Sequence, residues 1–100
     1  MQQFFLDNLP MKAKFSPAVQ KYLFRLQKKD KVLFLQIQKQ ITLFESNPRH
    51  PSLRLHALGG ELEALWSISI TRSIRMIYRQ LAEDIAYFTK IGTHEEVYDK

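Results

Sequence analysis

The sequence predicts an α+β fold: an N-terminal strand and a helical hairpin packed on a small, mostly antiparallel, twisted β-sheet. Two observations predict it. In the first half of the chain, apolar residues recur every three or four positions, as in amphipathic helices. In the second half they alternate with polar residues, as in strands with one buried face. Because both layers carry one apolar face, we expect the hairpin to cover one side of the sheet.

The helical hairpin is expected to follow a short strand at 11–15, where lysines alternate with apolar residues. Ser16 and Pro17 form a good helix start, because serine caps and proline is tolerated in the first turn. Asp30 is the expected cap of a second helix. That helix should end at "SNP", residues 46–48, since proline restricts the residue before it.

Three strands are expected in the second half, at 65–71, 73–79 and 85–91. A tight turn between the first two pairs apolar residues with apolar residues across the hairpin, as a half-buried sheet requires. The pairs are Ile70–Ile74, Ile68–Met76 and Trp66–Tyr78. On the opposite face, the same register places Ser69 beside Arg75.

Length and composition predict one domain over 1–100, with its core at 11–98 and an N-terminal extension at 1–10. One hundred residues, 45% of them apolar, suit a single core. The "LGGEL" stretch at 58–62 is expected to be a loop. The chain lacks cysteine, a secretory pattern and any window of the roughly 20 apolar residues that cross a bilayer. We therefore expect a cytoplasmic protein with no membrane attachment.

The charge is positive and unevenly distributed. The net charge is +5; residues 1–60 hold ten basic and three acidic side chains, whereas residues 61–100 hold five and seven. Such a balance favours a polyanion or an acidic protein as partner. A lysine-rich helical surface that is merely solvated is the alternative.

Two side chains near the predicted sheet are candidates for chemistry. Arg75 lies mid-strand on the uncovered face, where its planar fork of donors suits phosphate oxygens; pairing with a nearby carboxylate is the alternative. His94 follows Gly92, which lets the backbone turn as it leaves the sheet. Glu95 and Glu96 come next and could orient the imidazole. A single histidine is otherwise more often a surface or packing residue.

No metal or cofactor site is predicted. None of His50, His56 and His94 shows the spacing of a metal-binding pair, and no cysteine completes a zinc site. A phosphate-cradling glycine loop, a GxSxG motif and a dinucleotide fingerprint are also absent from the sequence. We therefore expect chemistry that uses side chains alone.

The segments "HPSLRLHALGGELEALWSISITRSIRMIYR" and "KIGTHEEVY" together resemble the RelE/ParE superfamily of bacterial toxins, and most closely its YafQ-type endoribonucleases. The matching pieces are a histidine loop at 56–59, a strand led by Trp66, a strand led by Arg75 and the terminal motif at 92–98. Each piece is short, but their order and spacing agree over roughly residues 11–98.

The resemblance implies a type II toxin that cleaves mRNA on the ribosome and is held inactive by a cognate antitoxin. In such chemistry the ribose 2′-OH attacks the adjacent phosphate and a 5′-OH leaves, without a metal. The basic helices would meet ribosomal RNA or the antitoxin. DNA operators would be bound only by the toxin–antitoxin complex.

Carried over residue by residue, the resemblance makes His94 a proton donor or acceptor, with His56 as its counterpart. Arg75 would stabilise the phosphate, and Tyr98 would pack on or hydrogen-bond the substrate. Contacts with the RNA backbone would come from four further cations: Arg54, Arg72, Arg79 and Lys90.

The sequence also departs from the family patterns. Ser69 and Ser73 stand where YafQ-type proteins carry a histidine and an aspartate, and Ser67 and Ser69 stand where RelE-type proteins carry lysines. Fewer proton-transfer groups leave the base unassigned, and each missing group costs about 10²–10⁴ in rate. Two alternatives therefore stay open: a ParE-like toxin that acts on DNA gyrase without nuclease activity, and an inactive corepressor that only binds the antitoxin.

Overall fold

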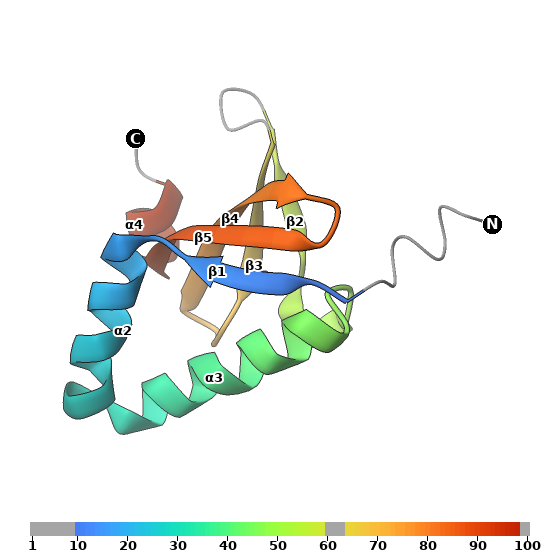
Figure 1. The fold of residues 1–100 in the computed structure, drawn as a ribbon. Coiled ribbons are helices and arrows are strands. Elements are labelled where there is room, and N and C mark those ends of the chain that lie inside the picture. The colour runs from blue at the N-terminus through green and yellow to red at the C-terminus, as the bar shows by residue number, and fades with distance from the viewer. Residues whose placement is uncertain (1–9, 60–63, 99–100) are drawn as a thin grey trace.

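In a computed structural model of the chain, two helices cover one face of a five-stranded sheet (Figure 1). The structure describes residues 10–59 and 64–98, so most of the expected extension at 1–10 lies outside it. None of the described helices is long and apolar enough to span a membrane. The α+β arrangement expected from the sequence is confirmed.

The helical hairpin has the expected bounds and caps. Helix α2 spans Pro17–Lys29, and the Ser16 hydroxyl accepts a hydrogen bond of 3.2 Å from the Val19 amide. Helix α3 spans Lys31–Ser46, and the Asp30 carboxylate accepts one of 3.1 Å from the Leu33 amide. These bonds satisfy amides that have no partner within the first turn of a helix, so they fix where both helices begin.

The five strands are β1 (Lys12–Phe15), β2 (His56–Leu58), β3 (Leu65–Ser69), β4 (Ile74–Ala82) and β5 (Ile85–Thr93). Their order across the sheet is β1-β5-β4-β3-β2, with β1 parallel to β5 and the other neighbours antiparallel. A short 3₁₀ helix, η1 (Pro51–Leu53), precedes β2. The mostly antiparallel sheet is therefore as expected, but its parallel edge joins the two ends of the chain.

The region around His56 differs from its predicted loop. Residues 56–58 form β2, which pairs with β3 so that His56 lies opposite Ser67. A strand of three residues is too short to show a period of two, and its pairing depends on a partner that comes later in the chain. The remainder of the expected loop lies mostly outside the described residues.

The β3–β4 hairpin has the predicted register: Ile68 pairs with Met76, Trp66 with Tyr78 and Ser69 with Arg75. At the turn, the Ile70 amide donates to the carbonyl of Ile74 at 2.8 Å. This register places the apolar partners on the helix side of the sheet and leaves Arg75 on the other side. The prediction that Arg75 faces away from the helical hairpin is confirmed.

The core fills the space between the helices and the sheet. Phe44 of α3, Tyr78 of β4 and Phe88 of β5 are buried, and their ring centroids lie 5.1 to 5.5 Å apart. Burial raises the pKa of the Tyr78 phenol to about 12. The buried Gln40 amide donates to the Ser69 carbonyl at 3.1 Å and so attaches α3 to the end of β3. The sheet is thereby held as a rigid support for side chains on its outer face.

Candidate functional site

The terminal motif at 92–98 contains a short helix. Helix α4 spans His94–Tyr98 and directly follows β5. The Thr93 amide donates to the Glu96 carboxylate at 2.7 Å, and the Glu96 amide donates to the Thr93 hydroxyl at 3.3 Å. This reciprocal pair is a capping box, which satisfies two amides at the start of the helix. The expectation that Glu96 orients the imidazole is therefore replaced by a capping role.

Gly92 leaves the space that the Glu96 side chain needs in this capping box. A methyl group at Gly92 would lie 2.7 Å from the Glu96 Oε1 atom and 3.1 Å from its Cβ atom, closer than side chains normally approach. Gly92 belongs to β5, so the expected turn out of the sheet is not where the glycine acts. The glycine instead leaves room for the glutamate to fold back over the strand.

Arg75 is held on the outer face of the sheet by two polar side chains and one backbone carbonyl. Its Nε atom donates to the Ser67 hydroxyl at 2.8 Å and to the Tyr98 hydroxyl at 3.1 Å, and Tyr98 donates to Ser67 at 2.7 Å. Its Nη2 atom also donates to the Arg54 carbonyl at 3.4 Å. The remaining N–H groups of the guanidinium, including both on Nη1, stay available for an anion.

Both candidate histidines line the same pocket as this arginine. The pocket has a volume of about 470 Å³ and is formed by His56, Leu58, Arg75, His94 and Tyr98. His94 and Tyr98 are four residues apart on α4 and so share one face of the helix. Their ring centroids lie 4.2 Å apart, edge to face. A guanidinium, two imidazoles and a phenol thus converge from β2, β4 and α4.

The four cations expected to contact the RNA backbone lie outside the pocket lining. Arg54 ends η1 in a left-handed backbone conformation (φ 47°), and its carbonyl, not its side chain, reaches Arg75. Arg72 is exposed on the β3–β4 turn. Arg79 and Lys90 are exposed on the outer face of β4 and β5: Lys90 lies opposite Ile77, and Arg79 lies two residues further along β4.

The serines at the departures from the family patterns have structural partners. Ser67 is fully buried and accepts hydrogen bonds from both Arg75 and Tyr98. Ser69 donates to the Thr71 carbonyl at 2.9 Å, and the Ser73 amide donates to the Thr71 hydroxyl at 3.2 Å, so both stabilise the turn. Ser67 is the site residue that the sequence interpretation missed. The predicted strand register could have identified Ser67, because it places Ser67 diagonally across from Arg75 on the same face of the sheet.

No group of three or more histidine or acidic side chains in the described part of the chain is placed to hold a metal ion. The pocket lining contains a cation, two imidazoles and a phenol. These are the side chains that bind anions and move protons.

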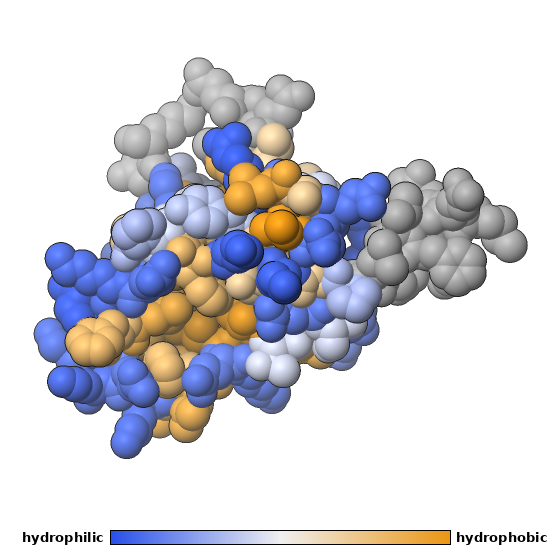
Figure 2. Space-filling view, viewed as in Figure 1, coloured by the Kyte–Doolittle hydropathy of each residue, from blue (hydrophilic) through white to orange (hydrophobic). Residues whose placement is uncertain are grey.

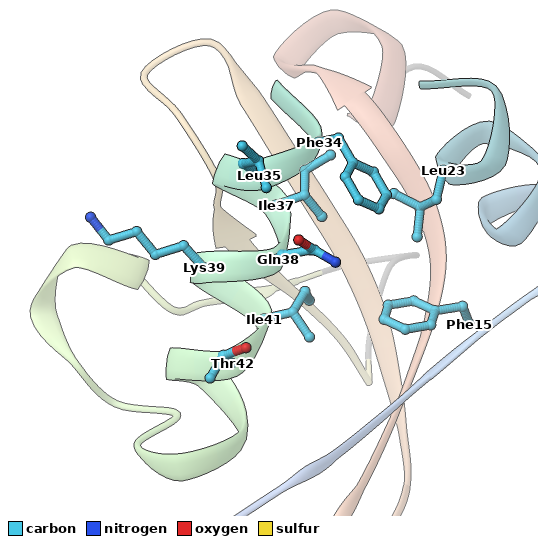
Figure 3. Close-up of a pocket in the computed structure, with 9 residues that line it drawn as sticks. All are labelled: Phe15, Leu23, Phe34, Leu35, Ile37, Gln38, Lys39, Ile41 and Thr42. Carbon is cyan, nitrogen blue, oxygen red and sulfur yellow. The ribbon is translucent and has the colours of Figure 1, made fainter. Parts of the chain in front are cut away.

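A second, apolar cavity lies on the opposite side of the molecule. It has a volume of about 720 Å³, and in Figure 3 Leu23 of α2 and Phe15 of β1 lie across from Ile37 and Ile41 of α3. We call this cavity the helix groove. Leu35, which lines this groove, is 57% exposed, and Phe24 of α2 and Val32 of α3 are 65% and 69% exposed. Figure 2 shows this apolar surface bordered by hydrophilic side chains.

The fold matches those of solved bacterial toxins. YafQ from E. coli superimposes with a TM-score of 0.69 at 19% sequence identity, over 88% of this chain and 98% of YafQ. A YoeB/ParE toxin from Agrobacterium tumefaciens gives 0.70 at 20% identity, over 84% of this chain and 99% of that one. A chain of the E. coli DinJ–YafQ toxin–antitoxin complex gives 0.68 at 20% identity, over 90% and 99%.

A scan against protein-family models and a search of curated proteins found no match. At about 20% identity, the structural matches establish the fold. The chain therefore has the fold of the YafQ and YoeB/ParE toxins, and the RelE-like architecture expected from the sequence is confirmed.

Proposed function

We propose that this protein is the toxin of a type II toxin–antitoxin module and that it cleaves mRNA on the ribosome. The observation that carries the proposal is the convergence of Arg75, His94, His56 and Tyr98 in one pocket. The fold shared with YafQ and YoeB/ParE toxins supports the same conclusion. A protein that binds gyrase has no need for a pocket of proton-transfer groups around a held arginine.

The proposed reaction is an internal transfer at a phosphodiester. The ribose 2′-oxygen attacks phosphorus and gives its proton to a base, and the bond from phosphorus to the 5′-oxygen breaks. The leaving 5′-oxygen receives a proton from an acid. The products are a 2′,3′-cyclic phosphate and a 5′-hydroxyl end, so no water or cofactor is consumed in the cleavage step.

His94 and His56 share the two proton-transfer roles, since both are exposed imidazoles on the wall of the same pocket. Arg75 stabilises the charge that develops on the phosphorane oxygens. Its Nε–H is engaged by Ser67 and Tyr98, so the guanidinium approaches the phosphate in a fixed orientation. Tyr98 is partly buried and edge-on to His94, where it limits the positions that the imidazole adopts.

The helix groove suits the antitoxin partner. Helices α2 and α3 carry six basic residues and one acidic residue, so the apolar groove lies on a strongly positive surface. An amphipathic segment with an acidic polar face complements both properties. Chains of this fold occur in complexes with antitoxins, as in DinJ–YafQ.

The enzymatic part of the proposal is tested with purified protein in a translation extract. We expect translation to stop and the reporter mRNA to be cut within codons, and we expect His94→Ala to restore translation. If His94→Ala and Arg75→Ala both remain fully inhibitory, the site is assigned wrongly.

The partner is tested by co-expression with the protein of a neighbouring short reading frame. Leu35→Glu, at the helix groove, should abolish co-purification. The matched control is Leu81→Glu, because Leu81 is equally exposed (57%) and lies on β4, away from the groove. Equal loss of binding in both variants would contradict the groove as the docking surface.

A further inference from the structure

Every charged side chain in the sheet is a cation, and all of them face the same way. The five are Lys12, Lys14, Arg75, Arg79 and Lys90, and no acidic residue occurs in the described strands. In β1 and β4 the alternation places Lys12, Lys14, Arg75 and Arg79 on the face opposite α2 and α3. In β5 the register shift between Ile77 and Tyr78 turns Lys90 to the same face, opposite Ile77. On this outer face Lys12, Lys14, Arg79 and Lys90 are exposed.

The strand register arranges these cations in a continuous band. Lys14 of β1 pairs with Tyr87 of β5, and Tyr87 pairs with Arg79 of β4, so the three lie in one row across neighbouring strands. Neighbouring strands are about 4.8 Å apart, so the row spans roughly 10 Å. The half-buried Tyr87 ring therefore lies between two positive side chains.

The row leads toward the pocket. Arg79 and Arg75 are four residues apart on β4, about 13 Å along the strand, and both face outward. Lys90 pairs with Ile77 between them. The cations thus extend from the edge strand β1 to the held guanidinium. We call this band, formed by Lys12, Lys14, Tyr87, Arg79 and Lys90, the outer-face band.

We propose that the outer-face band binds the single-stranded RNA that leads into the pocket, with phosphates on the cations and a base stacked on Tyr87. The proposal rests on the proposed function for the identity of the RNA strand. To the RNA contacts that the sequence suggested, it adds two cations, Lys12 and Lys14, and one aromatic ring, that of Tyr87. Basic side chains interleaved with an aromatic ring are typical of surfaces that track a nucleic-acid strand. An acidic protein is the less suitable occupant, because the described apolar groove lies on the opposite side of the molecule.

The test measures binding, so it is independent of cleavage. The full chain is titrated with a fluorescent RNA of roughly twelve nucleotides, within the range that such surfaces cover, in which every ribose is 2′-O-methylated to prevent attack. Lys14→Ala/Arg79→Ala should lower the slope of log affinity against log salt by about 1.4, or about 0.7 for each phosphate contact. The matched control is Lys29→Ala/Lys31→Ala, which removes the same charge from the exposed joint between the two helices and should leave the slope unchanged.

Tyr87 provides a second test, because its contribution to RNA affinity does not depend on charge. Tyr87→Ala should weaken binding roughly 5- to 150-fold through the lost stacking, and Tyr87→Phe should bind like the parent. Equal losses of RNA affinity in Lys14→Ala/Arg79→Ala and in the control Lys29→Ala/Lys31→Ala would overturn the inference, because binding would then follow net charge. Unchanged RNA binding in Lys14→Ala/Arg79→Ala would also overturn it and would point to an acidic protein on this face. RNA binding that depends on the band, in a protein that cuts no mRNA, would refute the proposed nuclease and leave this inference standing.

Discussion

Replacing Arg75 separates the contribution of its charge from that of its geometry. In Arg75→Ala, the 2.7 Å hydrogen bond from Tyr98 to Ser67 remains possible, so the phenol keeps its anchor and the loss reports on the guanidinium. Removing a preorganised donor to a developing anion costs about 10²–10³ in rate, or about 2.7–4 kcal/mol. Arg75→Lys keeps the charge but loses the fork that reaches Ser67, Tyr98 and phosphate at once. If that costs one charge-assisted hydrogen bond of about 1.5–3 kcal/mol, the rate falls roughly 10- to 150-fold.

The assay is the initial rate of reporter mRNA cleavage in a translation extract, measured by primer extension at matched concentrations of folded protein. Circular dichroism and thermal unfolding establish that each variant keeps the parent fold. We expect the parent to be fastest, the lysine variant intermediate and the alanine variant slowest. Cleavage by Arg75→Ala within about threefold of the parent, less than 1 kcal/mol of barrier, would refute the role of the guanidinium.

Four further outcomes are expected. His94→Ala and His56→Ala should each slow cleavage by about 10²–10⁴, whereas His50→Ala, which removes a histidine outside the pocket, should cleave like the parent. Thr93→Ala should remove one hydrogen bond of the capping box, destabilise α4 by about 1 kcal/mol and reduce cleavage, whereas the global unfolding temperature changes little. Burial raises the pKa of Tyr78 to about 12 in the folded protein, whereas the unfolded phenol loses its proton near pH 10. The free energy of unfolding from urea titrations should therefore fall by roughly 2–3 kcal/mol between these pH values, and Tyr78→Phe should remove that part of the decline. Purified protein should leave DNA supercoiling by gyrase untouched, and inhibition in that assay would favour the ParE-like alternative.

The parts of the fold that depend on local signals were predictable from the sequence. Ser16 and Asp30 are caps whose effect extends over one helical turn, and both helices begin where they indicate. The hairpin register was predictable because only one pairing places apolar residues opposite apolar residues. The parallel pairing of β1 with β5 was not predictable, because the alternation in each segment indicates a strand but not its partner. The three-residue β2 is too short to show a period, and it depends on its pairing with β3.

The candidate site was predictable in part, for similar reasons. The sequence, through its resemblance to known toxins, suggested Arg75, His94, His56 and Tyr98, and the structure brings these four to one pocket. The T-x-x-E pattern at 93–96 is that of a capping box, but the same glutamate also fits the expected role of a partner for the imidazole. In the sequence, Ser67 stands out only as a departure from the lysine of RelE-type proteins. Its role depends on its burial and on two hydrogen bonds, and neither property can be predicted from the residue type.

The most direct test of the proposed function is the chemistry of the ends left on a cleaved message. The toxin is induced in a bacterial host, and the 5′ ends of reporter mRNA fragments are mapped and tested for ligation with and without prior phosphorylation. Attack by the 2′-OH predicts 5′-hydroxyl ends at cuts within codons, only while the message is translated, and none with His94→Ala. Fragments with 5′-phosphate ends, or growth arrest with intact mRNA, would contradict a ribosome-dependent nuclease at this pocket.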